Sequence, residues 1–252
     1  MKLIKRWIRN ILIFFFVSTI LMVLAFKFVP VYFTPLMFIR CIEQIADGQG
    51  PVMEHKWVPL EEISHNAPQA VMASEDNLFL QHHGFDFEQI YKARIEAMNG
   101  KRERGASTIT QQTAKNVFLW PGHSWIRKGF EAYFTVLIEF IWGKERIMEV
   151  YLNSIEMGNG IYGIEAVAEI NFHTTAANLT KKQAALVATT LPNPRQRNSG
   201  NPTSWMNRRS NKIVDLMGKI EKFPYPDDKV DKKDNNDNEK PYKKKRNRNK
   251  RR

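Results

Sequence analysis

The chain has 252 residues and a formal net charge of +12 at neutral pH. This length fits one or two domains, and the positive charge indicates an anionic partner. The single cysteine, Cys41, excludes an intrachain disulfide but leaves the compartment open, because an exported protein can avoid pairing thiols.

The N-terminal segment is predicted to be a membrane anchor. Residues 1–10 are basic, residues 11–26 carry no charge, and the apolar pattern resumes after Lys27, so we place the anchor at 11–33. The positive-inside rule then predicts that residues 1–10 are cytoplasmic and that the rest is extracytoplasmic. A cleaved signal peptide is the alternative, which the absence of a small-residue cleavage pattern disfavours.

Residues 36–225 are predicted to form one mainly α domain, because helix start and stop signals recur along them. The segment 126–142 is apolar but carries four charges, so we assign it to a helix inside the protein rather than to a second membrane span. Short strands are expected at Val29–Phe33 and Met53–Pro59. The expected caps and breakers are Asp86 with Gln89, Asn99-Gly100, Ser124, Gly143, Thr180 with Gln183, Pro192 and Pro194.

The C-terminal segment, residues 226–252, is predicted to be a disordered basic tail. From Asp227 onward it holds twelve Lys or Arg against six Asp or Glu and almost no apolar residue. We expect it to contact anionic lipid or polymer. Nucleic acid is a disfavoured partner, because the predicted topology places the tail outside the cytoplasm.

The segment from Gly105 to Asn116 is unusually polar. If Thr108 begins a helix, then Thr108, Gln111, Gln112 and Lys115 share one face, near an N-terminus whose free N–H groups favour an anion. Phosphate and sugar hydroxyls suit such a row of donors. The alternative is a capped surface helix with solvated glutamines.

Four motifs, in order, give the chain a specific resemblance. Together they resemble the motif set of the peptidoglycan glycosyltransferases (family 51), which polymerise lipid-linked disaccharide-peptide, over roughly Glu61 to Pro194. The resemblance implies a lysozyme-like, mainly α domain. The motifs are Glu-Asp-x-x-Phe-x-x-His-x-Gly from Glu75, Gly-x-Ser-Thr-Ile-x-Gln-Gln-x-x-Lys-Asn from Gly105, Arg-Lys-x-x-Glu from Arg127 and Glu-x-Tyr-Leu-Asn from Glu149.

The resemblance implies that Glu75 is the general base. It would take the proton from the acceptor's 4-hydroxyl during inverting attack that expels undecaprenyl pyrophosphate, and Leu78 and Phe79 could raise its pKa by desolvation. Glu131 matches the second glutamate, which orients donor ligands; an ion pair with Arg127 is the alternative.

The resemblance also implies that cations and polar side chains bind the donor. Lys115 and Arg127 match a phosphate clamp, in which an ammonium and a guanidinium are complementary. Adjacent histidines, His82 and His83, are interpreted as structural hydrogen-bonding groups, because no ligand set at metal spacing accompanies them. Tyr151 and Asn153 are interpreted as support for the helices behind the site. The remaining implied substrate-binding residues are Ser107, Thr108, Gln111, Gln112 and Asn116.

Partners and location follow from the resemblance. We expect lipid II, the growing lipid-linked strand, membrane lipids and other cell-wall synthesis proteins as partners, at the inner membrane with the domain in the periplasm. The sequence requires no cofactor, and a magnesium ion at the pyrophosphate is left open. His123 stands where relatives often have arginine, which puts one phosphate contact in doubt.

Other classes of function fit the sequence less well. A lysozyme-like enzyme that cleaves peptidoglycan could share the fold and a lone glutamate, but Lys115 and Arg127 suit a pyrophosphate donor better. A membrane-anchored binding protein would leave Glu75 unexplained. A bifunctional enzyme is not expected, since no Ser-x-x-Lys motif follows the transferase region.

Overall fold

The structure is a computed structural model that describes residues 2–100, 105, 107–122 and 124–225. It is mainly α, as predicted. The helices are α1 (Lys2–Phe28), α2 (Pro35–Ala46), α3 (Asn66–Glu75), α4 (Phe87–Met98), α5 (Ile109–Phe118), α6 (Trp125–Ile141), α7 (Gly143–Ser154), α8 (Ile164–Phe172), α9 (Lys181–Thr190) and α10 (Ser204–Met217), with 3₁₀ turns η1 (Leu60–Glu62) and η2 (Ala176–Asn178).

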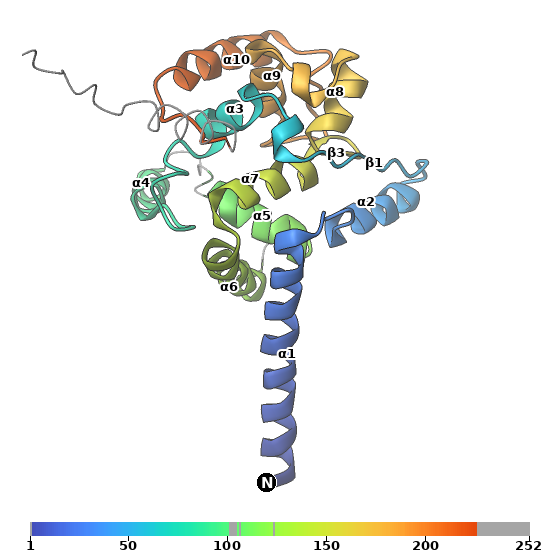
Figure 1. The fold of residues 1–252 in the computed structure, drawn as a ribbon, viewed down its shortest axis with the longest axis vertical. Helices are drawn as coiled ribbons and strands as arrows, with labels where there is room; N and C mark the ends of the chain where they lie inside the picture. The colour runs from blue at the N-terminus through green and yellow to red at the C-terminus, as the bar shows by residue number, and fades with distance from the viewer. Residues whose placement is uncertain (1, 101–104, 106, 123, 226–252) are drawn as a thin grey trace, which may run out of the picture.

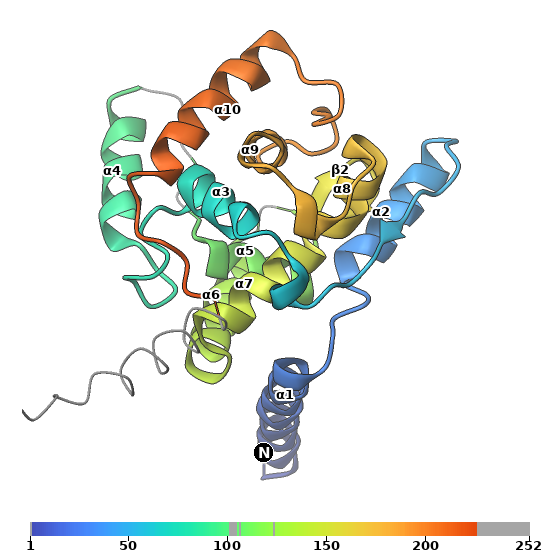
Figure 2. The same cartoon turned by 45° about the horizontal axis from the view of Figure 1, so that its top comes forward.

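The helices form a rounded domain from which α1 projects (Figure 1). Helices α5 and α6 lie beside the upper end of α1, whereas α9 and α10 lie at the opposite end of the domain. Figure 2 shows α3 alongside α9 and α10, with α4 flanking them. The length of the molecule therefore separates the tip of α1 from α10.

A single hydrophobic core connects these helices. Helix α7 runs through it, with Ile147, Tyr151 and Leu152 fully buried. The core cluster also takes Ile109 from α5 and Ala185 from α9, so the two ends of the domain share one interior. Because α5 packs on α7 and α3 packs on both α9 and α10, the end of α3 is held where the two groups of helices meet.

A small sheet closes the side of the domain near α8. Its strands are β1 (Glu54–His55), β2 (Glu156–Gly158) and β3 (Ile161–Tyr162), with β3 in the centre, parallel to β1 and antiparallel to β2. Asn153 joins the preceding chain to this region, since its Oδ1 accepts from Val58 N at 2.9 Å and its Nδ2 donates to Val58 O at 2.8 Å. This contact fits the supporting role predicted for Asn153.

The predicted anchor lies in one long helix. Helix α1 is long and apolar enough to cross a membrane, and most of its surface is exposed. It runs from Lys2 to Phe28, so the basic residues 2–10 belong to the same helix as the apolar residues that follow them. The expected strand at Val29–Phe33 was wrong: this segment has no regular structure, and Val29 O accepts from Arg146 at 2.6 Å.

Most predicted helix ends are confirmed. Asp86 accepts from Gln89 N at the start of α4, Ser124 caps α6, and Thr180 forms a capping box with Gln183 at α9. The strand expected at Met53–Pro59 is reduced to Glu54–His55. The predicted tail lies outside the described residues, and the domain boundaries stay predictions.

Candidate active site

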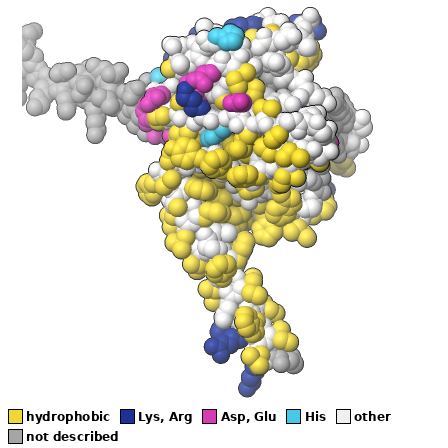
Figure 3. Space-filling view, turned by 90° about the vertical axis from the view of Figure 1, so that its right-hand side faces the viewer, with side chains coloured by type: hydrophobic (Ala, Val, Ile, Leu, Met, Phe, Trp, Pro, Cys, Tyr) yellow, Lys and Arg dark blue, Asp and Glu magenta, His cyan; other side chains and the backbone are white. Residues whose placement is uncertain are grey.

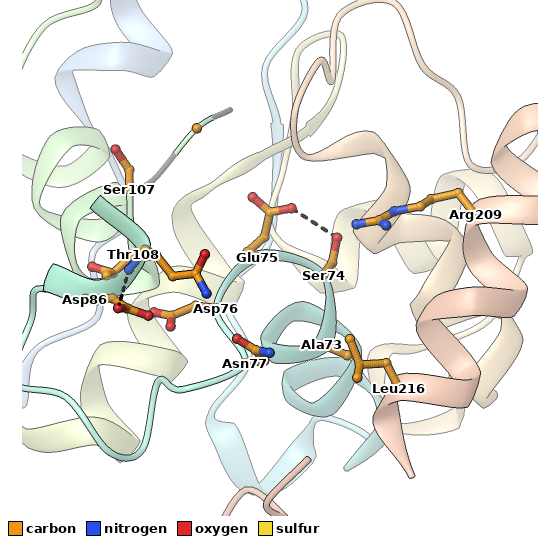
Figure 4. A pocket seen from close by; sticks show the side chains of 12 residues that line it. Ala73, Ser74, Glu75, Asp76, Asn77, Asp86, Ser107, Thr108, Arg209 and Leu216 are labelled. Atoms are coloured by element: carbon orange, nitrogen blue, oxygen red, sulfur yellow. Dashed lines mark hydrogen bonds between the residues drawn. The ribbon is translucent and has the colours of Figure 1, made fainter. Parts of the chain in front are cut away.

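Glu75 is the last residue of α3 and lines a cavity of about 150 Å³. Figure 4 shows its carboxylate between Ser107, which precedes α5, and Arg209, which extends from α10. Ser74 Oγ donates to Glu75 Oε1 at 3.0 Å, and Gln112 Nε2 donates to Oε2 at 3.2 Å. The carboxylate is thus held by one hydroxyl and one amide, at the side of a small polar cavity.

The orientation of the Gln112 amide is determined by Tyr151. The Tyr151 hydroxyl donates to Gln112 Oε1 at 3.1 Å, so the amide nitrogen must be the atom that faces Glu75. Tyr151 is fully buried, and burial raises the pKa of its hydroxyl well above the usual range. The phenol therefore stays protonated and remains a donor. Tyr151 was predicted to be supportive, and here it acts on Glu75 through Gln112.

Asp76 and the segment after it fix the distance between α3 and α5. Asp76 Oδ2 accepts from Ile109 N at 3.0 Å, and His82 Nε2 contacts both carboxylate oxygens, at 2.9 and 3.0 Å. Thr108 Oγ1 donates to Gly84 O at 2.7 Å. These bonds tie the first turn of α5 to the first motif, and they give His82 the structural role expected for it.

The two glutamines of α5 have different positions. Gln111 is buried, and its Oε1 accepts from Thr108 N at 3.1 Å in a capping box, so its side chain holds the helix start. Gln112, by contrast, bridges Glu75 and a second cavity. The row of donors expected on one face is therefore divided: Gln112, Lys115 and Asn116 line the second cavity, and Ser107 and Thr108 line the first.

The second cavity has a volume of about 410 Å³ and is rich in cations. Lys115 and Arg127, the two residues of the predicted phosphate clamp, both line it. Arg40 from α2 joins them, with its Nε 3.4 Å from the carboxylate of Glu156, which also lines the cavity. Arg127 Nε is buried and makes no hydrogen bond within the described part of the chain, so this donor is left unsatisfied. Three cations against one carboxylate leave the lining net positive, which suits a pyrophosphate.

Glu131 lies behind these cations. It is 2 % exposed, its Oε2 accepts from Arg127 NH1 at 2.9 Å, and its Oε1 accepts from Lys128 Nζ. Glu131 is not among the residues that line the second cavity. The structure thus contains the alternative ion pair with Arg127, and the predicted orienting role would act through Arg127 and Lys128.

Burial favours the neutral form of both Glu75 and Lys115, and it shifts their pKa values accordingly. Burial raises the pKa of Glu75, against the lowering effects of Gln112, Ser74 and Arg209. Burial likewise lowers the pKa of Lys115, helped by Arg127 and opposed by Glu131. Strongly perturbed pKa values in residues that line cavities are typical of a catalytic site.

Three cations at the site were missing from the predicted set. Lys128 Nζ lies 3.5 Å from Ser107 Oγ, and Lys128 was visible in the Arg-Lys motif. Arg40 and Arg209 come from α2 and α10, far away in the sequence, and no motif identified them.

His123 lies outside the described residues. Across residues 2–100, 107–122 and 124–225, no group of three or more His, Cys, Asp or Glu is placed to hold a metal ion. The magnesium ion stays an untested expectation.

Comparison with known proteins identifies the family. Residues 42–218 match the transglycosylase family model. The chain is similar to proteins named biosynthetic peptidoglycan transglycosylase from Bacteroides thetaiotaomicron (58 % identity, covering 92 % of this chain and 94 % of the relative) and Bdellovibrio bacteriovorus (49 %, covering 85 % and 86 %). A third, from Caulobacter vibrioides, is 46 % identical over 87 % of this chain and 95 % of its own length. The chain belongs to the transglycosylase family.

Proposed function

We propose that this protein is a peptidoglycan glycosyltransferase that polymerises lipid II into glycan strands. The observation that carries the proposal is the hydrogen bond between Glu75 and Gln112, because Gln112 also lines the cavity that holds Lys115, Arg127 and Arg40. A base beside a phosphate-binding cavity is what glycosyl transfer from a lipid pyrophosphate requires. The similarity to peptidoglycan transglycosylases supports the same activity.

In the proposed reaction, Glu75 accepts the proton from the 4-hydroxyl of the lipid II GlcNAc. The oxygen forms a bond to the anomeric carbon of the lipid-linked donor, with inversion, and the bond from that carbon to the phosphate oxygen breaks. The proton then passes from Glu75 to water. A glutamate with a raised pKa is a better base near neutral pH than an ordinary one.

The cations of the second cavity act on the leaving group. Lys115, Arg127 and Arg40 line it, and we propose that they bind the pyrophosphate of the donor and stabilise the negative charge that grows on it as the bond breaks. Glu131 keeps Arg127 and Lys128 in place through two charged hydrogen bonds. Leaving-group stabilisation by fixed cations makes a general acid unnecessary.

The location of the protein is proposed from its apolar surface. Figure 3 shows apolar side chains covering α1 and the adjoining lower part of the domain, with Lys and Arg at the free end of the helix. Trp125 and Phe140 on α6 are 93 % and 90 % exposed. We propose that α1 spans the inner membrane and that this lower surface dips into its periplasmic leaflet, where a substrate with a polyprenyl tail must be met. Association with other cell-wall synthesis proteins stays a proposal.

The test is product analysis. Purified full-length protein in detergent is incubated with lipid II, and the products are resolved by length; polymer with release of undecaprenyl pyrophosphate is expected. A parallel incubation with finished glycan strands tests whether the protein cleaves them instead. Cleavage of strands without any polymer would replace the transferase by a lysozyme-like hydrolase.

A further inference from the structure

A third cavity, beside the proposed active site, has no role in the chemistry described so far. It has a volume of about 440 Å³ and lies between α10 and the segment that follows α9. Its lining includes four cations and no carboxylate: Pro192, Arg197, Trp205, Arg208, Arg209 and Lys212. Such a lining favours an anionic ligand.

The third cavity adjoins both cavities of the proposed active site. Arg209 lines it and also lines the Glu75 cavity, while Pro192 lines it and the cationic cavity around Lys115. Figure 4 shows Arg209 reaching from α10 toward Ser74, next to Glu75. A substrate bound at Glu75 can therefore extend an anionic branch into the third cavity.

The side chains of the third cavity are suited to carboxylates. Arg208, Arg209 and Lys212 are exposed, and none of them forms an ion pair with a carboxylate in the described ranges. Arg197 is held in place instead: its NH1 donates to Thr189 O at 2.9 Å, and its guanidinium lies 4.5 Å from the centre of the Trp205 ring. Guanidinium and ammonium groups together can bind more than one carboxylate.

The position of the cavity distinguishes between the anionic parts of the substrate. Helix α10 lies at the end of the domain opposite α1 (Figure 1). A lipid pyrophosphate stays at the bilayer surface and would have to leave it to reach α10. The stem peptide is free of the bilayer, and its carboxylates are the remaining negative charges of a lipid-linked disaccharide-peptide.

From this geometry we infer that the third cavity is a subsite for the carboxylates of the stem peptide, positioned so that the acceptor sugar presents its 4-hydroxyl to Glu75. This inference rests on the proposed function. It adds recognition of a part of the substrate that the chemistry itself does not use.

The test compares two lipid-linked substrates, one with the native stem peptide and one in which its carboxylates are converted to amides. The variant is Arg208→Gln combined with Lys212→Gln, which leaves Arg209 and the Glu75 cavity intact. We expect the variant to raise KM for the native substrate by about fivefold, with kcat little changed, because two exposed charge pairs are lost. The amidated substrate should show the raised KM with the wild type, and the variant should add nothing to it.

Lys219→Gln is the matched control, because Lys219 is exposed, follows α10 and does not line the third cavity. Its KM should equal that of the wild type for both substrates. An equal rise in KM of the double variant for native and amidated substrates, or no rise for either, would overturn the subsite. A wild type that polymerises neither substrate would instead refute the proposed function, so the two failures are distinct.

Discussion

At the scale of single residues, Glu75 is subject to opposing influences. Burial raises its pKa, while the hydrogen bonds from Gln112 and Ser74 and the charge of Arg209 lower it. A base works only when deprotonated, so activity should fall as the pH drops below this pKa. Because the net shift is upward, the acidic limb of the pH–rate profile should lie above the ordinary range of a glutamate.

Replacing Glu75 by glutamine tests its role as the base. Glu75→Gln keeps the shape but cannot accept a proton, so kcat should fall by a factor of about 10² to 10⁴ while the donor still binds. Initial rates of polymerisation across a range of pH would show both the loss and the disappearance of the acidic limb. Near-wild-type polymerisation by this variant would refute the assignment.

Removing the hydroxyl of Tyr151 should alter the site indirectly. Tyr151→Phe frees the Gln112 amide to turn, so the hydrogen bond that lowers the pKa of Glu75 is weakened. We expect the acidic limb to move to higher pH and kcat/KM to fall by about five- to tenfold, the effect of one lost hydrogen bond.

Tyr162→Phe is the control for Tyr151→Phe. Tyr162 is equally buried, but its hydroxyl makes no hydrogen bond to any described residue. Its pH–rate profile should match that of the wild type. If the pH–rate profile of Tyr151→Phe matched that of Tyr162→Phe, the Tyr151 hydroxyl would not act on Glu75.

The sequence pointed to the segments of the candidate site better than to the contacts of individual side chains. The polar segment before Lys115 stood out because its residue types are unusual for a structural helix, and the motif around Glu75 stood out through the family resemblance. Gln111 and Gln112 could not be told apart, since the choice depends on where α3 lies. Arg40 and Arg209 were unpredictable for a similar reason: only tertiary packing brings α2 and α10 to the cavities.

At the scale of elements, local signals account for the helix ends but not for the short strands. A cap such as Thr180 acts within a few residues, so the sequence contains all of its partners. Strand β1 has only two residues and exists because β3 lies beside it, a pairing far away in the sequence. The segment Val29–Phe33, where a strand was expected, pairs with no strand among the described residues. The carbonyl of Val29 accepts a hydrogen bond from Arg146 instead.

Gly84 links the first motif to α5 and α6, and a side chain there should not be tolerated. Its φ is +86°, and an added Cβ would lie 2.7 Å from Thr135 Cγ2. Gly84→Ala combines backbone strain with a clash, so the free energy of unfolding should fall by about 2–4 kcal/mol. Thermal or urea unfolding measures this loss.

Gly129→Ala serves as the comparison for Gly84→Ala. Gly129 lies inside α6, and an added Cβ would meet nothing within 4 Å. Alanine there should raise the free energy of unfolding slightly, by about 0.5–1 kcal/mol. Equal stability of the two variants would contradict the strain argued for Gly84.

At the scale of the whole molecule, α1 is attached to the domain as well as being apolar enough to span a membrane. The Thr19 and Tyr133 hydroxyls lie 2.7 Å apart, Trp142 Nε1 donates to Val23 O at 2.7 Å, and Arg146 donates to Phe26 O. Phe15 packs against Phe130 and Tyr133 of α6. The second half of α1 is therefore part of the folded domain, which a prediction from hydropathy alone does not reveal.

Two truncations separate anchoring from folding. Deleting residues 1–14 removes half of the apolar helix but keeps every α1 contact with Tyr133, Trp142 and Arg146, so the melting temperature in detergent should stay near that of the full chain. Deleting residues 1–28 leaves Trp142 Nε1 without its acceptor and uncovers apolar surface of α6, so the melting temperature should drop by several degrees. Both truncations should weaken binding to vesicles, because both shorten the helix below the length that spans a bilayer. If the longer deletion were as stable as the shorter one, α1 would be only an anchor, and its contacts with the domain would not contribute to folding.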